Sequence, residues 1–336
     1  MGTTVALGAS RGFGTMVPSA WIGNVSVPVL RLLIVPIALS LGAGGVALAI
    51  AWGLPLALGA LASAVVLARL LGNPSRVGPG VTRRLAGEFW RFASPRGLAG
   101  VFQVTVMWLD VLLVGALLSS QKAGIYTVAS RYAVIGTLGL SAAGSAIAPQ
   151  ISRLFAQHRH TEAQDLFRSS TLWIVALAWP VLLIMAVFAP ALMGAFGHGF
   201  SSGAGALSVL AGAMLWLTGT GNSGIALLMT GRSWYTFAIT ALSVSVNIGL
   251  NLVLIPRLGI VGAAWAWAAT IVVANGLTVA ALAWVSGISP FGTGYYAVGG
   301  AALALFGGGG LIARLLVGPR LPVMIWYTAA ASAAYA

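Results

Sequence analysis

The chain has 336 residues, of which 59% are hydrophobic and only 6% are charged, whereas soluble domains carry about 25% charged residues. A surface with so little charge cannot stay dissolved in water, so the composition excludes a soluble globular protein and predicts that lipid is the solvent. The net charge of +13 would favour a nucleic-acid partner in a soluble protein. Here the basic residues lie between apolar runs and act as topology signals, so we expect membrane lipids, and no nucleic acid, around the chain.

The apolar runs predict an all-α, polytopic membrane helical bundle of about ten transmembrane helices, because a span needs about 20 apolar residues and open β-edges cannot face lipid. We expect three parts: residues 1–96 with two spans and a cytoplasmic linker, residues 97–284 with six spans, and residues 285–336 with two more. The expected spans are 24–42, 45–71, 97–118, 124–147, 171–192, 204–228, 236–255, 260–284 and 296–313, followed by a short tenth over 321–336.

The basic residues also predict an orientation. With the N-terminus inside the cell, eleven basic residues fall on the cytoplasmic side and four outside, which is the asymmetry expected of a protein in the cytoplasmic membrane. An even number of spans then places both termini in the cytoplasm.

Two cytoplasmic segments are expected to be more than linkers. Residues 83–92 place Leu85, Phe89 and Phe92 at helical spacing among arginines, which predicts a short interfacial amphipathic helix. In residues 151–170, Thr161 and Gln164 have the spacing of a capping box, which predicts a helix that begins there and continues into the next span.

The sequence offers no convincing catalytic or cofactor motif. It has no cysteine and no GxxxxGK[ST] phosphate-binding loop, so we expect no thiol chemistry and no ATP hydrolysis by this chain. Residues 199–203 match GxSxG, but in an expected loop between membrane helices, where the strand-turn-helix elbow that the motif needs is absent. His158 and His160 lack the further ligands of a metal site, so we expect a solvated loop, no metal, no cofactor and no enzyme.

Three ionisable residues fall inside expected spans: Arg31, Asp110 and Arg131. Each costs about 2.5–3.5 kcal/mol at a span centre, so each should face protein or water. Arg31 lies between Pro28 and Pro36, and two interpretations stay open: snorkelling to the interface, or a place on a substrate pathway beside a kinked helix.

Asp110 and Arg131 lie about ten residues on either side of an expected hairpin turn near Ser120. At about 1.5 Å rise per residue they should sit at one height, so we expect the two side chains to meet near the middle of the membrane. Either they form a static ion pair, or Arg131 binds an anionic substrate while Asp110 orients it or carries an ion.

Two further patterns allow a functional and a purely structural interpretation. Asn247 and Asn251 stand one helical turn apart and either line a polar pathway or bond a neighbouring helix. Small residues recur from Gly259 to Ala266, and here we favour the structural interpretation, close helix packing.

Several motifs in the same order resemble the polysaccharide-exporter branch of the MOP superfamily, which also includes MATE-type drug extruders and lipid II flippases. The segments that carry the resemblance are RGFG at 11–14, WLDVLLVG at 108–115, AGIYTVASRY at 123–132, APQISRLF at 148–155 and NLVLIPRLGIVGAA at 251–264. The resemblance covers almost the whole chain. It implies two symmetry-related lobes, fourteen spans and alternating access, and it matches 97–118 to the family's seventh span.

By this match the first four spans of the family are missing, so the N-lobe is incomplete. We expect a truncated start, a second chain that supplies the missing spans, or an inactive protein, and we expect that the chain alone does not complete transport.

The function that the resemblance implies is translocation of a polyprenyl-pyrophosphate-linked oligosaccharide, with membrane lipid and the lipid-linked sugar as partners. Arg131 and Arg31 would bind the substrate and Asp110 would serve ion coupling, with Asn247 and Asn251 on the pathway. The alternatives are a MATE-like exporter of cationic drugs, which should show several carboxylates inside spans, and a truncated membrane protein that transports nothing.

Overall fold

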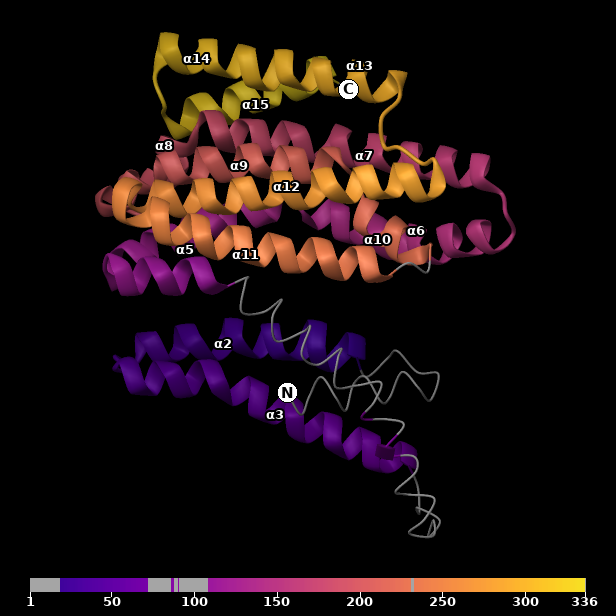
Figure 1. The fold of residues 1–336 in the computed structure, drawn as a ribbon. Coiled ribbons are helices and arrows are strands. Elements are labelled where there is room, and N and C mark those ends of the chain that lie inside the picture. The colour runs from indigo at the N-terminus through magenta and orange to yellow at the C-terminus, as the bar shows by residue number, and fades with distance from the viewer. Residues whose placement is uncertain (1–18, 72–85, 88–89, 91–107, 231–232, 336) are drawn as a thin grey trace. The chain divides into compact units, whose positions relative to one another are not determined.

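The computed structural model describes residues 19–71, 86–87, 90, 108–230 and 233–335, and these residues form helices and turns without a strand. The chain divides into two compact units, Met1–Arg96 and Gly97–Ala336, called unit 1 and unit 2 below (Figure 1). The predicted all-α class is therefore confirmed.

Unit 1 contains a helical hairpin. A π-helical segment, η1 (Ser19–Ser26), continues into α2 (Val27–Ser40), and α3 (Gly45–Leu71) follows after a turn. The hairpin packs closely at Gly59, where a Cβ atom would lie only 2.8 Å from the Val27 side chain. The amphipathic helix expected over 83–92 lies mostly outside the described residues.

Unit 2 is a layered bundle whose long helices lie side by side (Figure 1). Its first described helix is Trp108–Leu117; residues 97–107 of the expected 97–118 span lie outside the described part. The elements that follow are α5 (Ser120–Ile135), α6 (Leu138–Ala156), α7 (His160–Val187), α8 (Ala189–Gly194), η2 (His198–Gly203), α9 (Ala204–Gly219), α10 (Ser223–Met229), α11 (Ser233–Leu258), α12 (Ile260–Ser286), α13 (Thr293–Ala302), η3 (Leu303–Gly309), α14 (Gly310–Val317) and α15 (Leu321–Tyr335).

Among the described residues, seven helices are long and apolar enough to cross a membrane, or eight when α5 and α6 count as one bent span. Two of the seven are in unit 1 and five in unit 2. The helix Trp108–Leu117 and the 15-residue α15 are shorter, in line with the short tenth span expected at the end of the chain. Many large apolar side chains lie on the outside of this bundle, such as Trp173, Leu177 and Trp284, which is the surface that lipid favours.

The expected single span over 124–147 is instead a broken helix. Its first half begins at Ser120, where the Ser119 side chain caps the helix by accepting from the Lys122 N–H at 3.2 Å. The two halves, α5 and α6, meet at an angle of 45° around Gly136 and Thr137. A Cβ atom at Gly136 would collide with the Leu182 side chain of α7, so the break places a glycine where the helix packs against α7.

A second break interrupts the expected 204–228 span between α9 and α10. Gly221 there has a φ of 59°, a backbone conformation that favours glycine. The Asn222 side chain donates to the Leu140 carbonyl at 3.1 Å, and Leu140 lies in the first turn of α6. The two breaks are therefore next to each other and joined by a hydrogen bond.

The helix expected to begin near Thr161 and to continue into the next span exists as α7, but the capping box does not form. The helix begins at His160 without a side-chain cap. Gln164 instead pairs with the backbone of Ser289: it donates to the Ser289 carbonyl at 2.6 Å and accepts from the Ser289 N–H at 2.8 Å. This two-bond contact fixes the start of α7 to the loop between α12 and α13.

The small residues near Gly259 pack as the sequence predicted. Gly262, Ala263 and Ala266 are buried in α12, and a Cβ atom at Gly262 would overlap the backbone carbonyl of Leu254 in α11. The helices α11 and α12 can approach this closely only because residue 262 has no side chain.

This contact yields a stability prediction. Gly262→Ala should lower the apparent melting temperature of the purified protein, because overpacking against a backbone costs about 1–3 kcal/mol. Gly276→Ala is the matched control in the same helix, since a Cβ atom there meets nothing within 4 Å and alanine favours the helix. Equal melting temperatures for the two variants would contradict close α11–α12 packing.

Candidate functional site

Among the described residues of unit 2, the only acidic side chain in the apolar core is that of Asp110, which is 4% exposed. It comes from the helix Trp108–Leu117 and lies between α5 and α11. The Asn251 amide of α11 donates to one carboxylate oxygen at 2.7 Å, and the Tyr126 hydroxyl of α5 donates to the other at 3.4 Å. Asp110 is thus held by neutral donors from two other helices.

Asn247 completes this group, called the Asp110 cluster below: Asp110, Tyr126, Asn247 and Asn251. Both asparagines are fully buried. The Asn251 amide nitrogen also contacts the backbone and side-chain oxygens of Asn247, at 2.9 and 3.1 Å. Asn247 Nδ2 and Asn251 Oδ1 have no hydrogen-bond partner, so the cluster keeps a free donor and a free acceptor away from water, where each is costly.

The expected meeting of Asp110 and Arg131 is wrong. The guanidinium of Arg131 lies over the Trp108 ring, with its Cζ atom 4.5 Å from the ring centroid, while Asp110 is bonded to Asn251 and Tyr126. An expected equal height does not bring two side chains together, because rotation about each helix decides where side chains point. Residues two apart point about 200° apart around a helix, so Trp108 faces outward while Asp110 faces the core.

Arg31, in unit 1, has a similar neighbour. Its Nε donates to the Trp52 carbonyl at 3.2 Å, and its Cζ atom lies 4.4 Å from the centroid of the Trp52 ring. These contacts hold the guanidinium against α3.

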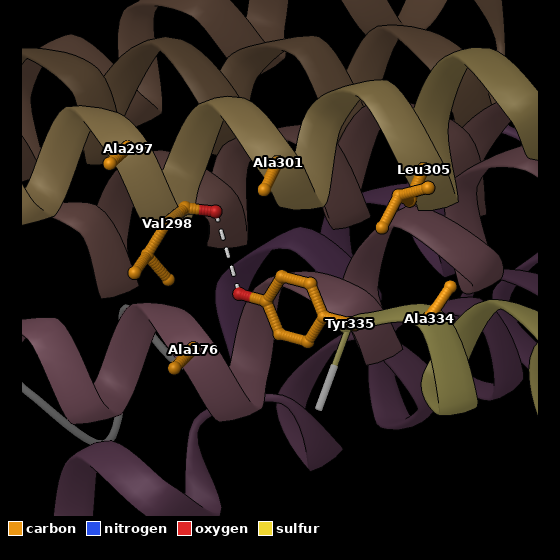
Figure 2. Close-up of a pocket in the computed structure, with 7 residues that line it drawn as sticks. All are labelled: Ala176, Ala297, Val298, Ala301, Leu305, Ala334 and Tyr335. Atoms are coloured by element: carbon orange, nitrogen blue, oxygen red, sulfur yellow. Dashed lines mark hydrogen bonds between the residues drawn. The ribbon is translucent and has the colours of Figure 1, made fainter.

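An apolar groove lies on another part of unit 2, between α7, α13, η3 and α15. Figure 2 shows the residues that line this cavity of about 360 Å³: Ala176, Ala297, Val298, Ala301, Leu305, Ala334 and Tyr335. The Tyr335 hydroxyl donates a hydrogen bond to the Val298 carbonyl at 3.4 Å. Without a charged lining residue, this groove does not suit a charged headgroup.

The structure gives no support to the GxSxG motif as a nucleophile site or to the histidines as metal ligands. The GxSxG residues form the short 3-10 turn η2 between helices, with none of the strand-turn-helix context that a nucleophile elbow needs. Within the described ranges, no three His, Asp or Glu side chains come together as metal ligands.

In unit 2 the sequence singled out Asp110, Arg131, Asn247 and Asn251, but it paired Asp110 with Arg131, whereas the carboxylate bonds Asn251 and Tyr126. Tyr126 and Trp108 were part of the resemblance without a role. The available signal was the rotation of each helix: Tyr126 lies on the buried face of α5, and Trp108 lies opposite Asp110 on its own helix.

These features define a multi-pass α-helical membrane protein with a sequestered acidic cluster and an exposed arginine in the same hairpin. Residues 28–198, about half of the chain, match the model of a family described as "Polysaccharide biosynthesis protein". The chain belongs to this family, which confirms the predicted polysaccharide-exporter relationship.

Two relatives from Haloferax volcanii carry names that describe them as probable flippases. The chain is 30% identical over 162 residues to the "Probable low-salt glycan biosynthesis flippase Agl15", covering 48% of this chain and 34% of that protein. It is 27% identical over 244 residues to the "Probable flippase AglR", covering 70% of this chain and 50% of that protein. The match thus spans half or less of each relative's length. No solved structure matches the chain.

The Asp110 cluster should contribute measurably to stability. Asn251→Ala removes the 2.7 Å donor to Asp110 and leaves a buried carboxylate oxygen without its partner, which costs about 1–3 kcal/mol. Its apparent melting temperature should fall well below that of Ser245→Ala, a control in the same helix whose hydroxyl is exposed and bonds only the Ala241 carbonyl.

A double variant separates the stability that comes from the Asp110–Asn251 hydrogen bond from the general cost of changing either residue. Asp110→Leu combined with Asn251→Leu removes both partners, so it should be more stable than Asp110→Leu alone. If the loss of stability in the double variant equals the sum of the losses in Asp110→Leu and Asn251→Leu, the two residues are not coupled.

Proposed function

We propose that this chain acts in a flippase of the cytoplasmic membrane that moves a polyprenyl-pyrophosphate-linked oligosaccharide by alternating access. The observation that carries the proposal is the separation of charge in unit 2: Asp110 is buried among neutral donors, and Arg131 is exposed without an acidic partner among the residues that the structure describes. Family membership and the flippase names of the two relatives support the same direction.

Arg131 would bind the anionic headgroup. Its guanidinium donates no hydrogen bond to any described residue, and its one recorded contact is the Trp108 ring. A pyrophosphate that enters a membrane loses water, and guanidinium donors can replace that water with charge-assisted hydrogen bonds. Arg31 is the second candidate contact, since only its Nε is engaged by a backbone carbonyl.

The Asp110 cluster would hold the coupling ion, either a proton or a monovalent cation. The carboxylate and the amide and hydroxyl oxygens around it are ligands that hard cations prefer, and the unpartnered Asn251 Oδ1 is a buried acceptor that a cation would satisfy. Asp110, Asn251, Asn247 and Tyr126 are the residues that would contact the ion.

The rival function, export of cationic drugs, is less well supported. The sequence has only four acidic residues, and Asp110 is the one that falls inside a span expected from the sequence. Its carboxylate faces helices on both sides, so it does not present a charge to a bulky cation.

Headgroup binding can be tested directly with farnesyl pyrophosphate and neutral farnesol on the protein in lipid nanodiscs. Wild-type protein should bind the pyrophosphate more tightly, and Arg131→Gln should weaken this binding roughly 10- to 100-fold, as expected for lost hydrogen bonds of about 1.5–3 kcal/mol to a charged group. Arg153→Gln is the control, because it removes the same charge from the exposed end of α6. Equal affinity of wild type for both probes would refute an anionic cargo.

Ion binding can be tested by stability. Sodium chloride should raise the melting temperature of wild type above its value in N-methylglucamine chloride at equal ionic strength, by mass action on the folded state, and Asp110→Asn should abolish the difference. Asp165→Asn, on the exposed first part of α7, should behave like wild type. If the ion is a proton, the difference between wild type and Asp110→Asn depends on pH instead. A sodium and pH response identical in both proteins would exclude the cluster as the ion site.

A further inference from the structure

Both arginines that the sequence placed inside spans, Arg31 and Arg131, lie over a tryptophan ring. The Cζ atom is 4.4 Å from the ring centroid for Arg31 over Trp52, and 4.5 Å for Arg131 over Trp108. These distances are well inside the range of about 6 Å for a cation–π interaction. Each unit of the chain therefore contains an arginine whose guanidinium lies over a tryptophan ring.

The Arg131 contact is the more informative one, because an acid was available two residues from Trp108. Asp110 and Trp108 lie on one helix, yet Asp110 points into the core, where Asn251 and Tyr126 occupy its oxygens. Trp108 is 41% exposed and shares the outer face of the hairpin with Arg131. The helices thus keep the carboxylate away from the guanidinium.

A tryptophan ring and a carboxylate hold an arginine with different consequences. A carboxylate would occupy the edge of the guanidinium and cancel its charge. A ring covers only a flat face, so the five N–H donors at the edge stay free and the full positive charge remains. Stacking also restricts a long side chain that would otherwise be mobile, so less conformational entropy is lost when an anion binds.

We propose that Trp108 is a positioning residue, which holds the Arg131 guanidinium in place with its charge intact so that it can accept a pyrophosphate headgroup. This inference rests on the proposed function, and it adds the means by which the site selects a doubly anionic group over a neutral lipid. Trp108 itself would not bind the headgroup.

Three substitutions distinguish positioning from bulk or structure, measured as affinity for farnesyl pyrophosphate and for farnesol in nanodiscs. Trp108→Leu removes the ring and should weaken pyrophosphate binding about 3- to 30-fold, the range that a cation–π contact supports. Trp108→Phe keeps an aromatic ring that attracts a cation less strongly, so it should weaken pyrophosphate binding less than Trp108→Leu does. Trp108→Glu can hold Arg131 but cancels its charge, so it should lose at least as much as Trp108→Leu.

Farnesol binding should stay unchanged in all three variants, because a merely structural role would affect both probes. In an Arg131→Gln background, Trp108→Leu should have no further effect. The control is Trp173→Leu, in an exposed tryptophan of α7 that stacks on no arginine in the described part of the chain. Trp108→Phe keeps the test valid if Trp108→Leu does not fold.

The outcomes separate the two proposals. If wild type prefers the pyrophosphate and Arg131→Gln loses that preference, but Trp108→Leu and Trp108→Glu bind like Trp173→Leu, the positioning role is overturned and the proposed function stands. If wild type binds farnesyl pyrophosphate no better than farnesol, the anionic cargo fails and the positioning role fails with it.

Discussion

Lipid tails offer no hydrogen bonds, so each polar group inside a span must find its partner within the protein. In unit 2 this constraint decides where Asp110 points. The carboxylate has Asn251 at 2.7 Å and Tyr126 at 3.4 Å, and both come from other helices. The acid therefore connects three helices, and the side of the hairpin that faces away from the core is left for Arg131. Burial of one acid and exposure of one base follow from the same requirement.

The same constraint explains the polar residues at the helix breaks. Where a helix is interrupted, its backbone groups lose their regular partners. Serine, threonine and asparagine side chains near the break between α9 and α10 bond nearby carbonyls: Ser223 donates to Thr220, Thr220 to Leu217 and Asn222 to Leu140. Broken helices of this kind are stable in a membrane when protein surrounds them, and Thr220 and Asn222 are buried.

The sequence predicted the all-α class and most of the long apolar helices, and it singled out Asp110, Arg131, Asn247 and Asn251 in unit 2, because hydropathy and the rarity of charge are strong local signals. It did not predict side-chain direction. Asp110 and Arg131 were expected at one height, but a rotation of about 100° per residue separates the directions of side chains that lie close in sequence. Nor did it predict the breaks at Gly136 and Gly221, since glycine is frequent throughout the chain. Gln164 was misassigned because its partner, Ser289, is 125 residues away.

The adjacent breaks have a mechanical consequence. Asn222 sits at one break and donates to Leu140, four residues beyond Gly136 at the other. A Cβ atom at Gly144 would also press against the Asn222 side chain, so α6 and the start of α10 are in direct contact. A tilt of α6 about Gly136 must therefore carry α10 with it or break this hydrogen bond. The hydrogen bond thus couples α6 to the start of α10 across two helix breaks that lie in separate spans.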